Sequence, residues 1–258
     1  MKARFSKLTL VTVALLTLTA CSQSQSSSSK SSTKEESKQT QTKSSKEMSS
    51  AKNPSKETGK EESSKAGKSD VKVDSGVSYN GSYYSVKGKY DEIVIANKHY
   101  PLSSDYNPGE NPTAKAKLLE LIAAMQGEGY PISHQYSGFR SYQMQVTLYQ
   151  NYVNKDGKEA ADRYSARPGY SEHQTGLAFD LIGTDGNLVT EKKASQWLLK
   201  HAAEYGFVVR YLNGKENETG YMPEQWHLRY VGKEAKAIAD SRLSLEEYYG
   251  FTGGGYKD

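Results

Sequence analysis

Residues 22–75 contain almost no large apolar side chains and consist mainly of Ser, Lys, Glu, Gln and Thr. A segment of this composition cannot bury enough apolar surface to offset the entropy that it would lose on folding, so it predicts a disordered tether. Its Ser-rich character is typical of a flexible coil that holds a folded unit away from its attachment point. Any hydrophobic core is therefore confined to residues 76–258, a length that suits one domain.

The start of the chain is typical of an export signal. An apolar run over residues 8–20 follows a basic beginning and is too short to cross a bilayer as a permanent helix. The run ends in Leu-Thr-Ala-Cys, which resembles the lipobox of bacterial lipoproteins, where the cysteine is lipid-modified and becomes the N-terminus. The alternative is an ordinary signal peptide followed by a chance cysteine. Because Cys21 is the only cysteine of the sequence, an internal disulfide is excluded.

These features divide the chain into a signal peptide (1–20), a tether (21–75) that begins at a lipidated Cys21, and one folded domain (76–258). We expect the protein at the outer face of the bacterial cytoplasmic membrane, reaching into the cell wall, and we expect a monomer. The net charge of +4 belongs to the leader and tether, because residues 76–258 carry 20 basic and 22 acidic residues. A mildly acidic domain without a basic stripe argues against nucleic acid as a partner.

Hydrophobic periodicity predicts both helices and strands in the folded part. The expected elements are a hairpin of strands 83–87 and 91–95, helices over 113–126, 192–205 and 233–240, a helix capped by Ser141, and strands over 207–211 and 226–230. In the helix after Ser141, we expect Met144, Leu148 and Val153 to lie roughly on one side. Since helices and strands do not alternate strictly, the pattern predicts an α+β domain with a mainly antiparallel sheet flanked by helices.

The stretch 171–180 (SEHQTGLAFD) holds the first group of chemically informative residues. On one continuous strand, His173 and Asp180 would point to opposite faces. Gly176 lies between them and allows a turn, after which Phe179 can face the core while Asp180 faces the other way. An imidazole and a carboxylate that converge in this manner are good zinc ligands.

The stretch 224–227 (EQWH) holds the second group. His227 can supply a third ligand and leave one coordination position for water, as a catalytic zinc site requires. Glu224 is close enough in sequence to act as a general base on that water without binding the metal itself. Trp226 would form a wall of the site and reduce its water content.

The two stretches together resemble the VanY-type D-alanyl-D-alanine carboxypeptidases and the related LD-carboxypeptidases. Their fold is shared with the zinc peptidases of vancomycin resistance and with the hedgehog signalling domain, and the resemblance covers roughly residues 100–232. It implies one Zn²⁺ per chain, held by His173, Asp180 and His227, with Glu224 as the base. Two His and one Asp also accept other divalent ions. For His99, His134 and His201 we expect structural roles.

A further segment, 138–141 (GFRS), places Arg140 directly before the predicted helix cap. A guanidinium and a helix N-terminus both favour negative charge. The resemblance implies that Arg140 lies beside the zinc, contacts the substrate and stabilises the tetrahedral oxyanion, whereas a surface salt bridge is the alternative. It also implies that Ser165 binds the terminal carboxylate of the substrate and that Gln145 assists. We expect Tyr211 to line the pocket, with a place in the core or on a wall-binding surface as the alternative.

The resemblance implies hydrolysis of the C-terminal D-alanine from peptidoglycan stem peptides. We favour an LD-carboxypeptidase, which acts on the tetrapeptide, over a DD-carboxypeptidase, which acts on the pentapeptide. A non-catalytic wall-binding lipoprotein would be expected to lack the base or a ligand, and an endopeptidase would need a groove open at both ends. A penicillin-binding type of serine mechanism is disfavoured because the folded part lacks the Ser-x-x-Lys set of motifs.

Overall fold

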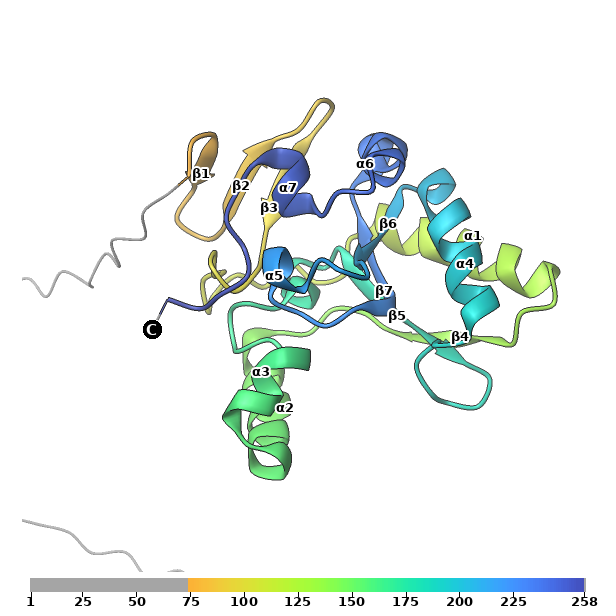
Figure 1. Cartoon of the computed structure of the whole chain (residues 1–258), viewed down its shortest axis with the longest axis horizontal. Coiled ribbons are helices and arrows are strands. Elements are labelled where there is room, and N and C mark those ends of the chain that lie inside the picture. Colours follow the sequence, from red (N-terminus) through yellow and green to blue (C-terminus); the bar gives the residue numbers. More distant parts are fainter. Residues whose placement is uncertain (1–73, 258) are drawn as a thin grey trace, which may run out of the picture. The chain divides into compact units, whose positions relative to one another are not determined.

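The computed structural model describes residues 74–257, and these form two antiparallel sheets with helices around them (Figure 1). The α+β prediction is therefore confirmed. The predicted signal peptide, Cys21 and the tether up to residue 73 lie outside the described residues. Across residues 74–257, none of the helices has the length and apolar character needed to cross a membrane.

The smaller sheet has the order β1-β2-β3 and contains the predicted hairpin. Its strands are β1 (Val77–Tyr79), β2 (Tyr84–Lys87) and β3 (Glu92–Ile95). The turn between β2 and β3 is closed by a hydrogen bond from Gly88 N to Asp91 O of 2.9 Å. Val86 and Ile93 point from this hairpin into a core cluster that also contains Val208.

The main sheet has the order β4-β5-β7-β6 and carries the chemically informative residues on its two central strands. Its strands are β4 (Ile132–Ser137), β5 (Ala178–Gly183), β6 (Phe207–Tyr211) and β7 (Glu224–Tyr230). On one face, Phe179 and Leu228 enter the larger core cluster. Asp180 and His227, each the neighbour of one of these residues, point to the other face because side chains alternate along a strand.

The helices are distributed unequally over the main sheet. They are α1 (Pro112–Gly127), α2 (Tyr142–Asp156), α3 (Lys158–Tyr164), α4 (Lys192–His201), α5 (Glu216–Thr219), α6 (Ala235–Ser241) and α7 (Leu245–Tyr249), with short 3-10 turns η1 (Glu172–Thr175), η2 (Ala202–Tyr205) and η3 (Gly232–Glu234). Figure 1 shows α1 and α4 beside the main sheet, and both contact its strands, whereas α2 and α3 pair with each other away from α1 and α4. The opposite face, which carries Asp180 and His227, contacts η1 and the smaller sheet, where Arg229 Nη2 donates a 2.7 Å hydrogen bond to Val94 O.

Helix α1 confirms the prediction for 113–126 and shows why this segment is helical. Asn111 caps it by accepting a hydrogen bond from Ala114 N of 2.9 Å, and Pro112 stands where its missing N–H breaks no helical hydrogen bond. Four apolar residues of the predicted stripe are at most 1% exposed, namely Leu118, Leu121, Ile122 and Met125. Burial of this stripe against the sheet anchors one layer of the domain.

Several sequence-based boundaries need correction. Ser141 does cap α2, and Gln145 is the one buried residue of this helix, whereas Met144 is 55% exposed. The predicted helix over 192–205 tightens into the 3-10 turn η2 for its last residues. The strand predicted at 226–230 begins earlier, at Glu224.

Candidate active site

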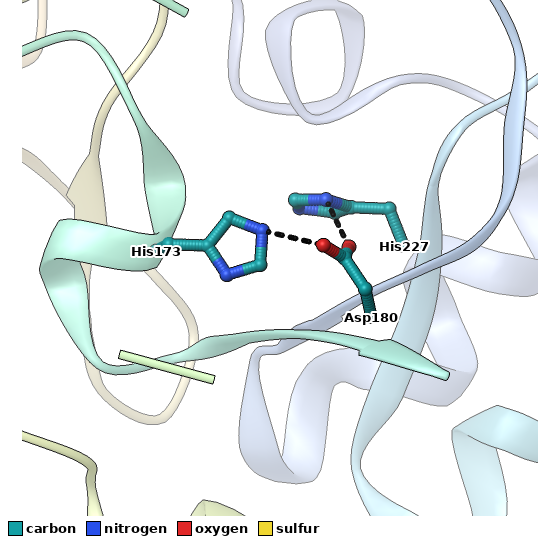
Figure 2. A group of neighbouring side chains, drawn as sticks. All are labelled: His173, Asp180 and His227. Atoms are coloured by element: carbon teal, nitrogen blue, oxygen red, sulfur yellow. Dashed lines mark ion pairs between the residues drawn. The ribbon is translucent and has the colours of Figure 1, made fainter. Parts of the chain in front are cut away.

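His173, Asp180 and His227 converge on one point (Figure 2). His173 comes from η1, Asp180 from β5 and His227 from β7, and all three are buried. The distance from His173 Nε2 to Asp180 Oδ2 is 3.1 Å, and that from His227 Nδ1 to Asp180 Oδ1 is 3.0 Å. One potential ligand atom of each residue lies within 4.8 Å of the others, so the three can hold a single metal ion.

Two features of the backbone, the pairing of β5 with β7 and the turn at Gly176, bring the three side chains together. Asp180 and His227 are register partners across β5 and β7, so their side chains stand on the same face of the sheet. His173 reaches them because the chain reverses at Gly176, whose φ of 71° lies in the left-handed region that favours glycine. The turn packs against the start of α1, where Asn111 N donates a 3.0 Å hydrogen bond to Gly176 O.

The hydrogen bonds around the cluster fit a divalent metal ion. His173 Nδ1 lies 2.8 Å from the carbonyl oxygen of Gly138, which can only accept, so Nδ1 carries the hydrogen and Nε2 is left to bind metal. Asp180 Oδ1 is buried and makes no hydrogen bond of good geometry within the described residues, although His227 Nδ1 is close to it. Two ring nitrogens and a carboxylate are the ligand types of a catalytic zinc site.

The electrostatics keep the aspartate charged. Burial raises the pKa of Asp180, but His173 and His227 lower it by more, so the net pKa lies below the usual range of a carboxyl group. A carboxylate in this state is available as a metal ligand at neutral pH.

Glu224 stands beside the cluster with the properties of a general base. It begins β7, and its Oε2 lies 3.6 Å from His227 Nδ1. Burial raises the pKa of Glu224 to about 7, against an opposing effect of His227. A carboxyl group whose pKa is close to the working pH can both accept and return a proton.

Arg140 faces the cluster from the segment between β4 and α2. Its Nη2 lies 3.5 Å from Asp180 Oδ2, and its Nη1 donates a 3.0 Å hydrogen bond to Gln145 Oε1. Its buried Nε has no hydrogen-bond partner among the described residues, so it is available to a negatively charged ligand. The ion pair of Arg140 therefore lies inside the site and not on the surface.

A cavity of about 200 Å³ opens onto the cluster and includes the other predicted residues in its lining. These are Gln145, Ser165, Tyr211 and Trp226. The ring centroid of Tyr211 is 4.9 Å from that of His227. Gln145, however, uses both ends of its amide within the protein, because its Nε2 also donates a 2.7 Å hydrogen bond to Ala166 O. Its place in the structure is thus to hold Arg140 against the loop that contains Ser165.

A family profile described as VanY, D-alanyl-D-alanine carboxypeptidase, matches residues 109–233. The solved L,D-carboxypeptidase DacB from Streptococcus pneumoniae is 77% identical, with a TM-score of 0.69, and the match covers 70% of this chain and 98% of that chain. The chain belongs to the VanY family of D-alanyl-D-alanine carboxypeptidases.

More distant VanY-family relatives carry the other specificity in their names. The vancomycin-resistance D,D-pentapeptidase VanY, solved in complex with Zn(II), is 32% identical, with a TM-score of 0.53 over 60% of this chain and 96% of that chain. A D-alanyl-D-alanine carboxypeptidase from Enterococcus faecalis is 33% identical in an alignment that covers 60% of this chain. This chain spans 65% of the length of that enzyme.

Sequence reasoning missed part of the site of this VanY-family chain. Tyr152 and Tyr164, from α2 and α3, line the cavity and pack edge to face with centroids 5.1 Å apart. Glu172 also lines it and approaches His227 Nε2 at 3.3 Å. A signal for Glu172 existed, because it stands directly before His173 within the motif.

The other histidines take no part in the ligand cluster. His201 pairs with Glu204 at 3.0 Å on the protein surface, and His134 is exposed. His99 packs edge to face against Tyr100. A second cavity, of about 510 Å³, lies between α4 and α6 and contains none of the ligand cluster in its lining, so the chemistry belongs to the smaller cavity.

Proposed function

We propose that this chain is a zinc-dependent LD-carboxypeptidase that removes the C-terminal D-alanine from peptidoglycan tetrapeptide stems. The observation that carries the proposal is the buried cluster of His173, Asp180 and His227 with Glu224 beside it. The LD specificity is supported by identities of 77% to the solved LD-carboxypeptidases LdcB and DacB, against 32% to the D,D-pentapeptidase VanY and 33% to the D-alanyl-D-alanine carboxypeptidase from Enterococcus faecalis.

The residues of the site divide the reaction among them. Zinc, when bound by His173, Asp180 and His227, supplies Lewis-acid chemistry and lowers the pKa of water. Glu224 accepts a proton from the attacking water at its carboxylate and returns it to the amine nitrogen of the departing D-alanine. Arg140 lines the cavity, has an Nε without a hydrogen-bond partner among the described residues, and stabilises the negative charge that develops on the scissile carbonyl oxygen.

Whether cleavage is terminal depends on a group in the cavity that binds the free carboxylate of the peptide. We assign Ser165 to the terminal carboxylate of the peptide, because it is buried and lines the cavity on the loop that Gln145 holds. An exopeptidase needs such a closed end, and an endopeptidase would need it open. Tyr211 and Trp226 complete the walls and limit the access of water.

The proposed setting follows from the leader of the chain. A lipid on Cys21 would anchor the protein at the outer face of the cytoplasmic membrane, and the tether would let one monomeric domain reach stem peptides in the cell wall. Each chain would hold one zinc ion.

The test is to follow release of free D-alanine from L-Ala-D-Glu-L-Lys-D-Ala and from the same peptide extended by D-Ala. Zinc-loaded wild type, chelated wild type and Glu224→Gln are compared. Glu216→Gln is the matched control, because Glu216 is an acidic residue paired with Arg163 at 2.9 Å on the protein surface.

Zinc-dependent release from the tetrapeptide, lost in Glu224→Gln and kept in Glu216→Gln, is the expected result. Release from the pentapeptide alone would make the protein a DD-carboxypeptidase. Release from neither peptide by the zinc-loaded protein would refute the exopeptidase proposal in favour of a wall-binding lipoprotein.

A further inference from the structure

Glu172 is a buried charge that the proposed reaction does not use. It is the first residue of η1, directly before His173, and is 2% exposed. Its Oε1 accepts hydrogen bonds from Arg210 Nε at 2.8 Å and from Arg229 Nη1 at 3.0 Å. An isolated buried carboxylate is costly, so two arginines on one oxygen show a carboxylate that the fold keeps charged.

The other oxygen of Glu172 is directed at a predicted metal ligand. Oε2 lies 3.3 Å from His227 Nε2, while His227 Nδ1 lies 3.0 Å from Asp180 Oδ1 on the other side of the ring. The imidazole of His227 therefore stands between two carboxylates. One of them belongs to the ligand cluster, and the other stands behind it.

This arrangement decides which ring nitrogen can bind metal. A neutral imidazole has one N–H, and only the nitrogen without hydrogen can be a ligand. A carboxylate can only accept, and of the two carboxylates only Glu172 is hydrogen-bonded to the ring, since Asp180 Oδ1 has no hydrogen-bond partner among the described residues. Glu172 therefore holds the hydrogen on His227 Nε2 and leaves the lone pair of Nδ1 for the metal. His173 has the opposite arrangement, because Gly138 O holds the hydrogen on its Nδ1. The two histidines thus present different nitrogens, each with an acceptor behind it.

We propose that Glu172 is a positioning residue that fixes His227 in the tautomer and orientation required for metal binding. This inference rests on the zinc site of the proposed function. Arg229, two residues after His227 on β7, and Arg210 on β6 hold the Glu172 carboxylate in place from the sheet.

Glu172→Gln tests the inference because the amide has one oxygen and one NH₂ group. The two arginine donors select the amide oxygen on their side, so the NH₂ group faces His227 Nε2. That nitrogen must then accept, and the ring hydrogen moves to Nδ1, the nitrogen that faces the metal. We expect zinc to bind about 10–100-fold more weakly, the usual loss when such a supporting partner is removed.

Glu246→Gln is the matched control. Glu246 is 3% exposed and binds the same Arg210 with two hydrogen bonds, of 2.6 and 2.8 Å, and its carboxylate contacts that arginine and not the His227 ring. Its substitution disturbs the buried charge network without changing the partner of His227. Glu172→Asp is a second variant, which keeps a charge near the arginines but withdraws the carboxylate from His227.

The readouts are the zinc dissociation constant of the full chain, from competition with a chromogenic chelator, and the visible spectrum of the Co²⁺-loaded protein. Thermal unfolding of the metal-free variants reports stability separately. Weaker zinc binding and an altered Co²⁺ spectrum in Glu172→Gln and Glu172→Asp, with both near wild type in Glu246→Gln, support the proposal.

Zinc affinity of Glu172→Gln within twofold of wild type would overturn the proposal, as would equal losses in Glu172→Gln and Glu246→Gln. Wild type that binds no zinc would overturn it together with the proposed function. Wild type that binds zinc but releases no D-alanine would refute only the proposed function, because the ratio of zinc dissociation constants still decides the role of Glu172.

Discussion

Substitution of Gly176 by alanine tests how the turn before β5 builds the site. Gly176 has a φ of 71°, and a Cβ at this position would overlap the carbonyl oxygen of Gly109 and lie 3.2 Å from Asn111 N. Both neighbours are backbone atoms of the segment that leads into α1, so neither can move aside as a side chain can. Relief of the overlap must shift either this segment or the η1 turn that carries His173.

Gly186→Ala is the control that separates the two contributions to this cost. Gly186 has a φ of 81°, but its added Cβ would meet no atom within 4 Å. Its substitution therefore introduces only the left-handed conformation of an alanine, which costs about 1–2 kcal/mol. Gly176→Ala adds to this an overlap with fixed backbone of about 1–3 kcal/mol, so we expect a loss of about 2–5 kcal/mol in the free energy of unfolding.

The assay is urea unfolding of the metal-free variants, followed by zinc titration. We expect the larger loss of stability in Gly176→Ala, accompanied by weaker zinc binding because His173 is displaced, and unchanged zinc binding in Gly186→Ala. Equal losses of stability in the two variants, or wild-type zinc affinity in Gly176→Ala, would refute the reasoning.

Three further predictions concern catalysis. Burial raises the pKa of Glu224 to about 7, and a base acts when it is deprotonated. We therefore expect kcat/KM for D-alanine release to rise with pH around a midpoint well above 4.5. A midpoint near the ordinary pKa of glutamate would contradict this. Arg140→Lys should lower kcat about 10²–10³-fold, because a lysine cannot keep the hydrogen bond to Gln145 and also reach the oxyanion. Steady-state kinetics measure the loss, and metal analysis should show that zinc is still bound. Tyr256→Phe removes the hydroxyl that accepts a 2.9 Å hydrogen bond from Arg167 N, in the loop that also contains Ser165. This loop should become more mobile, so KM should rise while kcat is unchanged. An unchanged KM would show that Tyr256 does not support the loop.

The part of the site that the sequence predicts is the part encoded locally. His173 and Asp180 belong to one short motif, and the glycine between them identifies the turn, so their convergence follows from the sequence itself. The second motif indicates the partner of Asp180 on β7. The position of that partner depends on the register of β5 against β7, which places His227 opposite Asp180.

The contacts of Glu172 could not be predicted in this way. Its partners Arg210, His227 and Arg229 are 38, 55 and 57 residues away in sequence, and they meet it only after the strands have paired. A buried cluster of charges also has no hydrophobic periodicity, which is the feature that reveals α1. The burial pattern of α2 could not be predicted for a related reason. Its one fully buried side chain is the polar Gln145, whose partners Arg140 and Ala166 lie in separate loops.

The central claim is that one zinc ion held by His173, Asp180 and His227 enables release of D-alanine from the tetrapeptide. Its most direct test is to remove the metal from the purified protein, add zinc back in measured amounts and follow D-alanine release. We predict that activity rises in proportion to the zinc added and reaches its plateau at one equivalent per chain. Undiminished release by the metal-free protein, or a plateau at a different stoichiometry, would contradict the claim.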